Sequence, residues 1–181
     1  ETGQTNAAMQ FMEKALNLNP RNANAAHFFA HILYEENEVL AGREFLNAWM
    51  PNYDRRSLLY GHLSWHQALW ALNDGDEQTM WSLVDNSVSP ENTSSSPINA
   101  LTDTASIYYR AELAGYDISS ERWRKLSKYA VEKFPNMGQS FADVHAALAH
   151  AMAGKDEHLY KLIEGNNGFA GDIVQSVARA W

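Results

Sequence analysis

Two short segments of the sequence each carry a pair of histidines four residues apart. They are His27 and His31 in HFFAH, and His62 and His66 in HLSWH. Residues at positions i and i+4 lie on one face of an α-helix, so each pair would present two imidazoles to the same space. Imidazole exchanges protons near neutral pH and is the commonest metal ligand among the side chains. The spacing therefore indicates either metal ligation or acid–base chemistry.

A metal site is one hypothesis for these residues. The metal-ligand candidates His27, His31, His62 and His66 could supply three or four neutral nitrogens to a divalent transition metal. Glu35, Asp103 or Asp143 could add a ligand or orient an imidazole. The chain has no cysteine, so thiolate zinc sites and disulfides are excluded. No glutamate follows the first histidine of either pair, which excludes the HExxH pattern of zinc proteases. A divalent transition metal is the one cofactor that the sequence suggests, and the sequence does not require it.

A metal-free acid–base site is the second chemical hypothesis. Its candidate catalytic residues are His66, His145, Asp103 and Asp143. In such a site an aspartate would orient the imidazole, and Arg110 would hold an anionic group of the substrate. A nucleophile is hard to assign, because Ser106 and Ser140 lack the GxSxG elbow. Glycine motifs for nucleotide binding are also missing.

The balance of charge argues against nucleic acid as a partner. The 181 residues include 14 Lys and Arg against 22 Asp and Glu, which gives a formal net charge of −8 at pH 7. The longest basic run, at Arg122-Trp123-Arg124-Lys125, is too short to follow a phosphate backbone. We therefore expect a partner other than DNA or RNA.

Hydropathy predicts a soluble chain with no membrane partner, because no window of about 18 apolar residues occurs. The opening Glu1-Thr2-Gly3 lacks the features of a signal peptide, which favours a cytoplasmic location. The chain does not begin with Met and opens as if at the end of a helix. We therefore expect a fragment of a longer repeat protein, with oligomers formed through exposed repeat ends as an option.

Turn signals recur along the chain at a nearly constant spacing. They stand roughly 34 to 40 residues apart, at Gly3, Asn37, Gly75, Gly115 and Gly154. After each of the last three glycines an acidic residue is placed to cap the next helix. Each turn lies between two stretches with apolar periodicity, which is typical of stacked helix pairs.

The same periodicity predicts ten helices and no strand. Prolines 20, 51 and 135 are expected to end helices. The predicted ranges are 4–18, 23–36, 39–50, 56–73, 77–86, 100–114, 120–134, 138–153, 156–164 and 170–181. The serine-rich segment 87–99 is the only long loop. We interpret it as an inserted loop within a single helical-repeat domain, 1–181, with a linker between two subdomains as the alternative.

Several of these residues resemble a known repeat family. Ala8, Ala15 and Pro20 stand where the second half of a tetratricopeptide repeat has its small residues and closing proline. The spacing of five residues between Ala15 and Pro20 recurs between Ala130 and Pro135. The resemblance implies an all-α fold. It also implies a right-handed solenoid of tetratricopeptide-like helix-turn-helix repeats, with about five units.

A narrower resemblance covers most of the chain. Four segments follow one another in an order similar to that in the tetratricopeptide repeat protein 38 family. They are 26–31, 61–69, 103–110 and 141–146, and they contain the histidine pairs, Tyr109-Arg110 and Phe141-Ala142-Asp143-Val144-His145. This resemblance implies an architecture and does not name a reaction.

In tetratricopeptide arrays the first helix of each pair lines the concave side. Side chains at the same height along neighbouring first helices could therefore converge from several repeats on one ligand. His27, His31, Tyr34 and Glu35 form one stripe along such a helix. The residues expected to bind the ligand are His27, His31, Tyr34, Glu35, His62, Trp65, His66, Asp103, Arg110 and His145.

The leading functional hypothesis is a binding module whose concave groove takes a peptide, a protein or a small polar ligand. The alternative is a metal-dependent or acid–base enzyme that uses the histidines of the same groove. A plain packing role also stays open, because His62 and His66 lie among leucines and tryptophans whose company is typical of buried histidines. His150 and His158 are expected at the surface.

Overall fold

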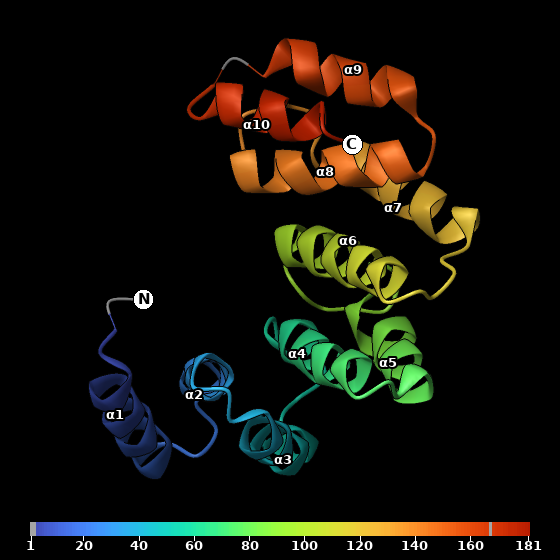
Figure 1. Ribbon diagram of the computed structural model, residues 1–181. Coiled ribbons are helices and arrows are strands. Elements are labelled where there is room, and N and C mark those ends of the chain that lie inside the picture. Colours follow the sequence, from blue (N-terminus) through green and yellow to red (C-terminus); the bar gives the residue numbers. More distant parts are fainter. Residues whose placement is uncertain (1–2, 167) are drawn as a thin grey trace. The chain divides into compact units, whose positions relative to one another are not determined.

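The computed structural model describes residues 3–166 and 168–181, and all regular secondary structure in them is helical (Figure 1). This confirms the predicted all-α class. Within the described residues no helix combines the length and the apolar composition needed to cross a bilayer. The helices are α1 (Thr5–Leu18), α2 (Ala23–Glu35), α3 (Val39–Trp49), α4 (Tyr60–Asn73), α5 (Glu77–Leu83), α6 (Pro97–Leu113), α7 (Ser120–Lys133), α8 (Ser140–Met152), α9 (Asp156–Gly165) and α10 (Gly171–Ala178), with a 3₁₀ turn η1 (Met50–Asn52) and a π-helical turn η2 (Val84–Val88).

Side-chain caps and left-handed turns explain where the helices begin and end. The Asn22 side chain accepts a hydrogen bond from the backbone N–H of Ala25 at 3.1 Å, which caps α2. Asp76 caps α5 in the same way. The predicted turns at Gly75, Gly115 and Gly154 all have positive φ, a conformation that glycine adopts without steric cost.

The predicted boundaries at the start of α4 and on both sides of the loop before α6 are wrong. Helix α4 begins at Tyr60 rather than at 56, because the Asp54 side chain draws the chain into a separate turn by accepting the N–H of Arg56. The predicted loop 87–99 is shorter, since η2 extends to Val88 and α6 begins at Pro97 after the cap of Ser96. The irregular segment is therefore 89–96.

The described residues divide into two compact units. The first comprises the residues up to Val88 together with Asn92–Ser95, and the second comprises Ser89–Glu91 and Ser96–Trp181. The predicted organisation as a single domain stays a prediction.

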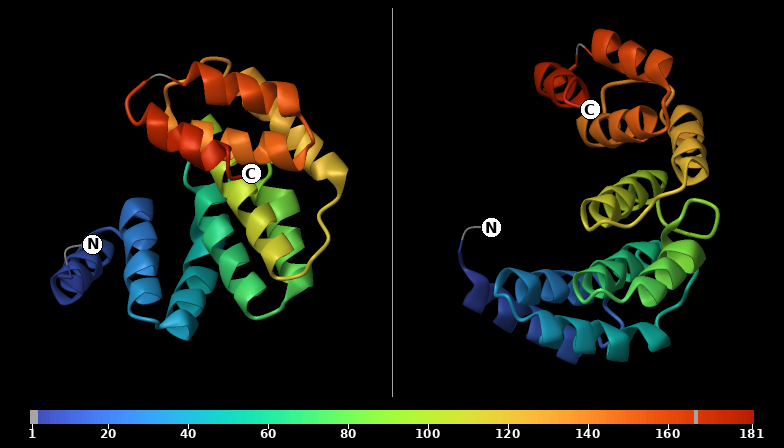
Figure 2. Two further views of the ribbon diagram at one scale, coloured as in Figure 1. Left: turned by 45° about the horizontal axis from the view of Figure 1, so that its top comes forward. Right: turned by 45° about the vertical axis from the view of Figure 1, so that its right-hand side comes forward.

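In the first unit, consecutive helices pack in chain order from α1 to α5. Figure 2 shows these helices in blue to green from two further directions. Gly42 of α3 lies so close to the Trp70 ring of α4 that an added Cβ would be 2.8 Å from it. The buried core of this unit comprises Ala30, Leu46, Met50, Leu63 and Trp70. It joins α2, α3 and α4, and so fixes the positions of the helices that carry the histidine pairs.

In the second unit, α8 packs against α6, α7, α9 and α10. Most of its buried residues are alanines, which permit close approach on several sides at once. Trp123 of α7 is fully buried, its indole N–H donates to Glu112 of α6 at 2.8 Å, and its ring meets Tyr108 edge-on. These contacts lock α7 to α6.

Gly61, the residue before His62, provides a test of the local packing around α4. An added Cβ would lie 2.7 Å from the Ser87 carbonyl oxygen and would also clash with the hydroxyls of Thr93 and Ser95. We expect Gly61→Ala to lower the free energy of unfolding by about 1 to 3 kcal/mol, as overpacking does, although alanine is the better helix former. Urea denaturation measures the difference. A gain of about 1 kcal/mol, as helix propensity alone would give, would contradict the proposed close packing.

Candidate metal centre

The two histidine pairs lie on α2 and α4, and both pairs face the same space. On α2, Ala26 and Ala30 are buried on the neighbouring face of the helix, and His27 and His31 lie on the face that contacts the histidines of α4. On α4, His66 is 7% exposed and His62 is half-buried. His31 is the most exposed of the four. The i, i+4 spacing thus places each pair on one helix face, as predicted.

The ring nitrogens of the four histidines converge. Nε2 of His27 lies 2.9 Å from Nε2 of His31 and 2.9 Å from Nε2 of His62. One ring nitrogen from each of His27, His31, His62 and His66 lies within 4.8 Å of the other three. Among the described residues this is the group of side chains that could hold a metal ion, and it contains no carboxylate.

Hydrogen bonding among the imidazoles does not account for this arrangement. A neutral imidazole Nε2 carries either a proton or a lone pair, both of which lie in the ring plane. At most one of the two short contacts of His27 Nε2 can therefore be a well-aligned hydrogen bond. Nε2 of His66 is buried and has no hydrogen-bond partner. A shared cation would use the lone pairs of all four nitrogens.

The spacing of the nitrogens suits such an ion. A tetrahedral zinc ion with bonds of 2.0 to 2.1 Å keeps its ligand nitrogens about 3.3 Å apart. The shortest separations here are 2.9 Å, and all lie within 4.8 Å, so they bracket that value.

The environment keeps two of the imidazoles neutral at physiological pH. Burial, together with the neighbouring histidines His62, His31 and His27, lowers the pKa of His66 to about 2. Burial and the proximity of His62 and His31 lower the pKa of His27 to about 4. Because only a neutral imidazole can donate its lone pair to a metal, both side chains are in the ligating form at pH 7.

Two tryptophans of α4 hold the imidazoles in place. The Trp65 ring stacks on His62 with a centroid distance of 5.3 Å and an interplanar angle of 16°, and it meets His66 edge-on at 4.9 Å. The Trp70 ring also lies near His66, with a centroid distance of 6.4 Å. The binding residues predicted from the sequence included Trp65 and not Trp70. Trp70 stands four residues after His66, and this spacing was the signal that the two side chains share a helix face.

Tyr34 and Glu35 continue along α2 beyond the cluster. Tyr34 is 57% exposed, and Glu35 is also exposed. Glu35 lines a groove next to His31 and does not belong to the group of metal-ligating atoms. The prediction that Glu35 would serve as a further ligand is therefore not supported by the described geometry.

The remaining candidates lie in the second unit. Nδ1–H of His145 donates to the Phe141 carbonyl at 2.7 Å, while burial lowers the pKa of His145 and the Asp103 charge offsets part of that effect. Asp103 itself is buried. The acid–base hypothesis for Asp103 and His145 stays a prediction.

The other predicted carboxylate has a different role. Asp143 accepts hydrogen bonds from the Gly138 backbone N–H at 2.9 Å and from the Asn166 amide at 2.8 Å. These bonds hold the start of α8 to the end of α9. Arg110 lies at the surface, where its Nε–H donates to Ser106 at 3.2 Å. Because these residues and the four clustered histidines belong to different units, one groove lined by all ten predicted residues stays a prediction.

The expectation that His150 lies at the surface is wrong. His150 is 5% exposed, its Nδ1 lies 2.8 Å from Ser127 Oγ, and its ring is 5.3 Å from the half-buried His158 ring. Burial and the neighbouring His158 lower the pKa of His150 to about 4. The sequence could not show this, because four different helices pack around α8 and cover the side that carries His150.

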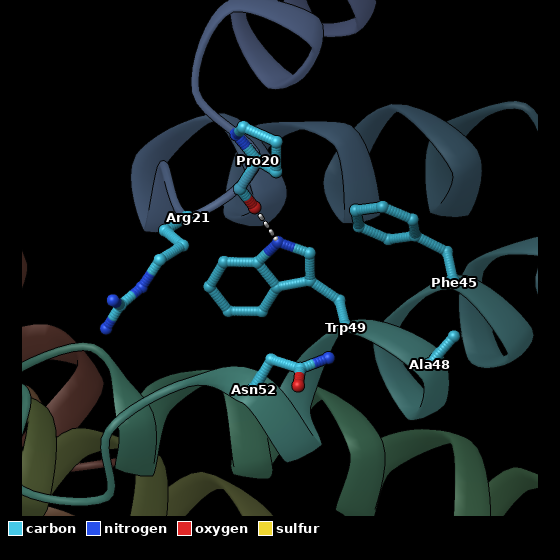
Figure 3. Close-up of a pocket in the computed structure, with 6 residues that line it drawn as sticks. All are labelled: Pro20, Arg21, Phe45, Ala48, Trp49 and Asn52. Carbon is cyan, nitrogen blue, oxygen red and sulfur yellow. Dashed lines mark hydrogen bonds between the residues drawn. The ribbon is translucent and has the colours of Figure 1, made fainter.

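A hollow of about 400 Å³ near α3 offers much less chemistry (Figure 3). Trp49 lies across it, and its indole N–H donates to the Pro20 carbonyl at 2.7 Å, which ties α3 to the turn before α2. Phe45 and Ala48 form its apolar wall, with Arg21 and Asn52 at the side. Trp49 therefore has the packing role that is usual for such residues.

Comparison with known proteins adds no assignment. No protein-family model matches the chain, and no match was found among solved structures. The resemblance to tetratricopeptide repeats thus stays a prediction, and the geometry of the four histidines is the basis for any functional conclusion.

The buried His150 predicts a specific pH dependence of stability. Because its pKa is about 4 in the folded chain and near 6.5 when unfolded, the unfolded state binds more protons between these values. The stability it contributes is complete above pH 6.5 and is lost as the pH falls toward 4. Between pH 7 and pH 5 we expect the free energy of unfolding of His150→Gln to fall by roughly 2 kcal/mol less than that of the wild type. Urea denaturation with a chelator present measures both proteins. Equal losses in both proteins would contradict the lowered pKa.

Proposed function

We propose that the first unit binds one divalent transition metal ion through His27, His31, His62 and His66. The observation that carries the proposal is the convergence of four ring nitrogens within 4.8 Å of one another. Two further features support it: Nε2 of His66 is buried without a hydrogen-bond partner, and His27 and His66 are neutral at pH 7 because burial lowers their pKa.

The ligand set favours zinc. Imidazole nitrogen suits zinc, copper and nickel, whereas magnesium and calcium prefer oxygen ligands, which the cluster lacks. Two imidazoles come from each of two helices, and within each pair the rings are nearly perpendicular, at 82° for His27 with His31 and 77° for His62 with His66. Zinc in structural sites is almost always held by four protein ligands in a tetrahedral arrangement, so we propose zinc for this set of four.

Four protein nitrogens would complete a tetrahedral coordination sphere. Catalytic zinc sites usually keep only three protein ligands and leave the fourth position to water. The metal-binding role is therefore proposed ahead of hydrolysis. A metal-dependent enzyme is the second candidate, and the observation that favours it is the exposure of His31, whose release would open one position.

We further propose that the helices continue the pattern of tetratricopeptide-like repeats, as a right-handed solenoid with a ligand-binding concave side. This proposal is supported by the packing of consecutive helices within each unit and by the left-handed turns at Gly75, Gly115 and Gly154. The peptide-binding hypothesis depends on it, and it is secondary to the metal site.

Metal titration tests the main proposal. We expect the chain, freed of metal by a chelator that is then removed, to bind one equivalent of Zn²⁺ in isothermal titration calorimetry. His27→Ala and His66→Ala each remove one of four ligands and should weaken binding by at least about 100-fold, more than the loss of a supporting residue does.

His158→Ala is the matched control, because this histidine lies outside the cluster. It should bind Zn²⁺ as the wild type does. Circular dichroism of each variant without metal checks that the helices are retained. If the folded His27 and His66 variants bind Zn²⁺ as tightly as the His158 variant, the cluster is not the metal site and the proposal fails.

A further inference from the structure

A groove of about 1060 Å³ runs between α1 and α2 and reaches the histidine cluster. His31 belongs to both, since it is one of the four clustered histidines and also lines the groove. A molecule in the groove would therefore lie beside a ligand of the proposed metal ion. The lining residues that matter here are Phe11, Met12, Phe28, His31, Ile32 and Glu35.

The walls of this groove are largely apolar. Phe11 of α1 is 67% exposed and Phe28 of α2 is 54% exposed, so both rings offer apolar surface that the unit itself does not cover. Among the described residues that line the groove there is no lysine or arginine. A highly charged ligand such as a phosphate ester would find no cationic side chain here, whereas a hydrocarbon chain would remove both phenylalanine rings from water.

The proposed metal ion would give one end of the groove a positive charge. Four neutral imidazoles leave the full charge of a divalent ion uncompensated, and the cluster includes no carboxylate. An anionic group entering at His31 would complement that charge. The groove thus joins a site for an anion to a site for an apolar body.

We propose that the groove binds a small monocarboxylate with an apolar chain, its carboxylate on the metal beside His31 and its chain between Phe11 and Phe28. This inference rests on the proposed metal site. Because the four imidazoles fill a tetrahedral sphere, the carboxylate oxygen would enter as a fifth ligand on the side of His31, which lines the groove.

The apolar part of the groove makes the proposed site selective. Phe28 stands three residues before His31 on α2, whereas Glu35 stands four residues after it, so the chain of the ligand would run away from Glu35. A second carboxylate at the far end of the chain would lie near the phenylalanine rings without a partner for its charge, which disfavours dicarboxylates. Octanoate and suberate have chains of the same length, and so they form a matched pair of probes for this selectivity.

Cobalt-substituted protein provides the test, because the visible absorption of Co²⁺ changes in intensity when its coordination changes. We expect octanoate to alter the Co²⁺ spectrum at lower concentrations than either suberate or acetate does. Phe11→Ala should raise the octanoate concentration needed by about fivefold through lost apolar contact, with Co²⁺ binding unchanged. Glu35→Gln should lower the octanoate concentration needed, because it removes a negative charge one helical turn from His31.

Leu18→Ala is the control for Phe11→Ala, since Leu18 is 79% exposed on the same helix and is not among the residues that line the groove. It should leave the octanoate response unchanged. If Co²⁺ binds through the four histidines and octanoate leaves its spectrum unaltered, the groove proposal is wrong and the metal site stands. An equal response to acetate and octanoate, or to octanoate in the Phe11 and Leu18 variants, also overturns it. If Co²⁺ does not bind, it is the proposed function that fails.

Discussion

The crowding of four imidazoles between α2 and α4 is the constraint on which this account depends. Bringing these rings together costs free energy, because a buried nitrogen without a partner, such as Nε2 of His66, destabilises a fold by about 1 to 3 kcal/mol. Apolar side chains of similar size would avoid that cost. The arrangement is explained if the nitrogens share a cation, which turns an unfavourable cluster in the free chain into a set of ligands that needs little rearrangement.

Much of the first unit supports this cluster. The core of Ala30, Leu63 and Trp70 fixes the separation of α2 and α4, and the close approach of Gly42 to Trp70 keeps α3 against α4. Trp65 stacks on His62 and limits the rotation of its ring. The helical frame therefore positions the ligands, and His31 is the one at the exposed edge of the cluster.

The sequence predicted the helices and the histidine pairs because both follow from local periodicity. The spacing of His27 and His31 alone places them on one helix face, and the turn glycines mark the helix ends. Local patterns could not show that the two pairs meet, that carboxylates such as Glu35 stay outside the cluster, or that His150 is buried. These facts depend on packing between helices distant in sequence. For the same reason the loop at 87–99 was overestimated: the π-helical turn is stabilised by its contacts with α4 and α5.

The most direct test of the central claim is X-ray absorption at the zinc edge, recorded on the chain loaded with one equivalent of Zn²⁺. The account predicts four nitrogen neighbours at about 2.0 Å, with the outer-shell pattern of imidazole rings. A first shell made mainly of oxygen atoms, without imidazole scattering, would show that the four histidines do not hold the metal and would contradict the account.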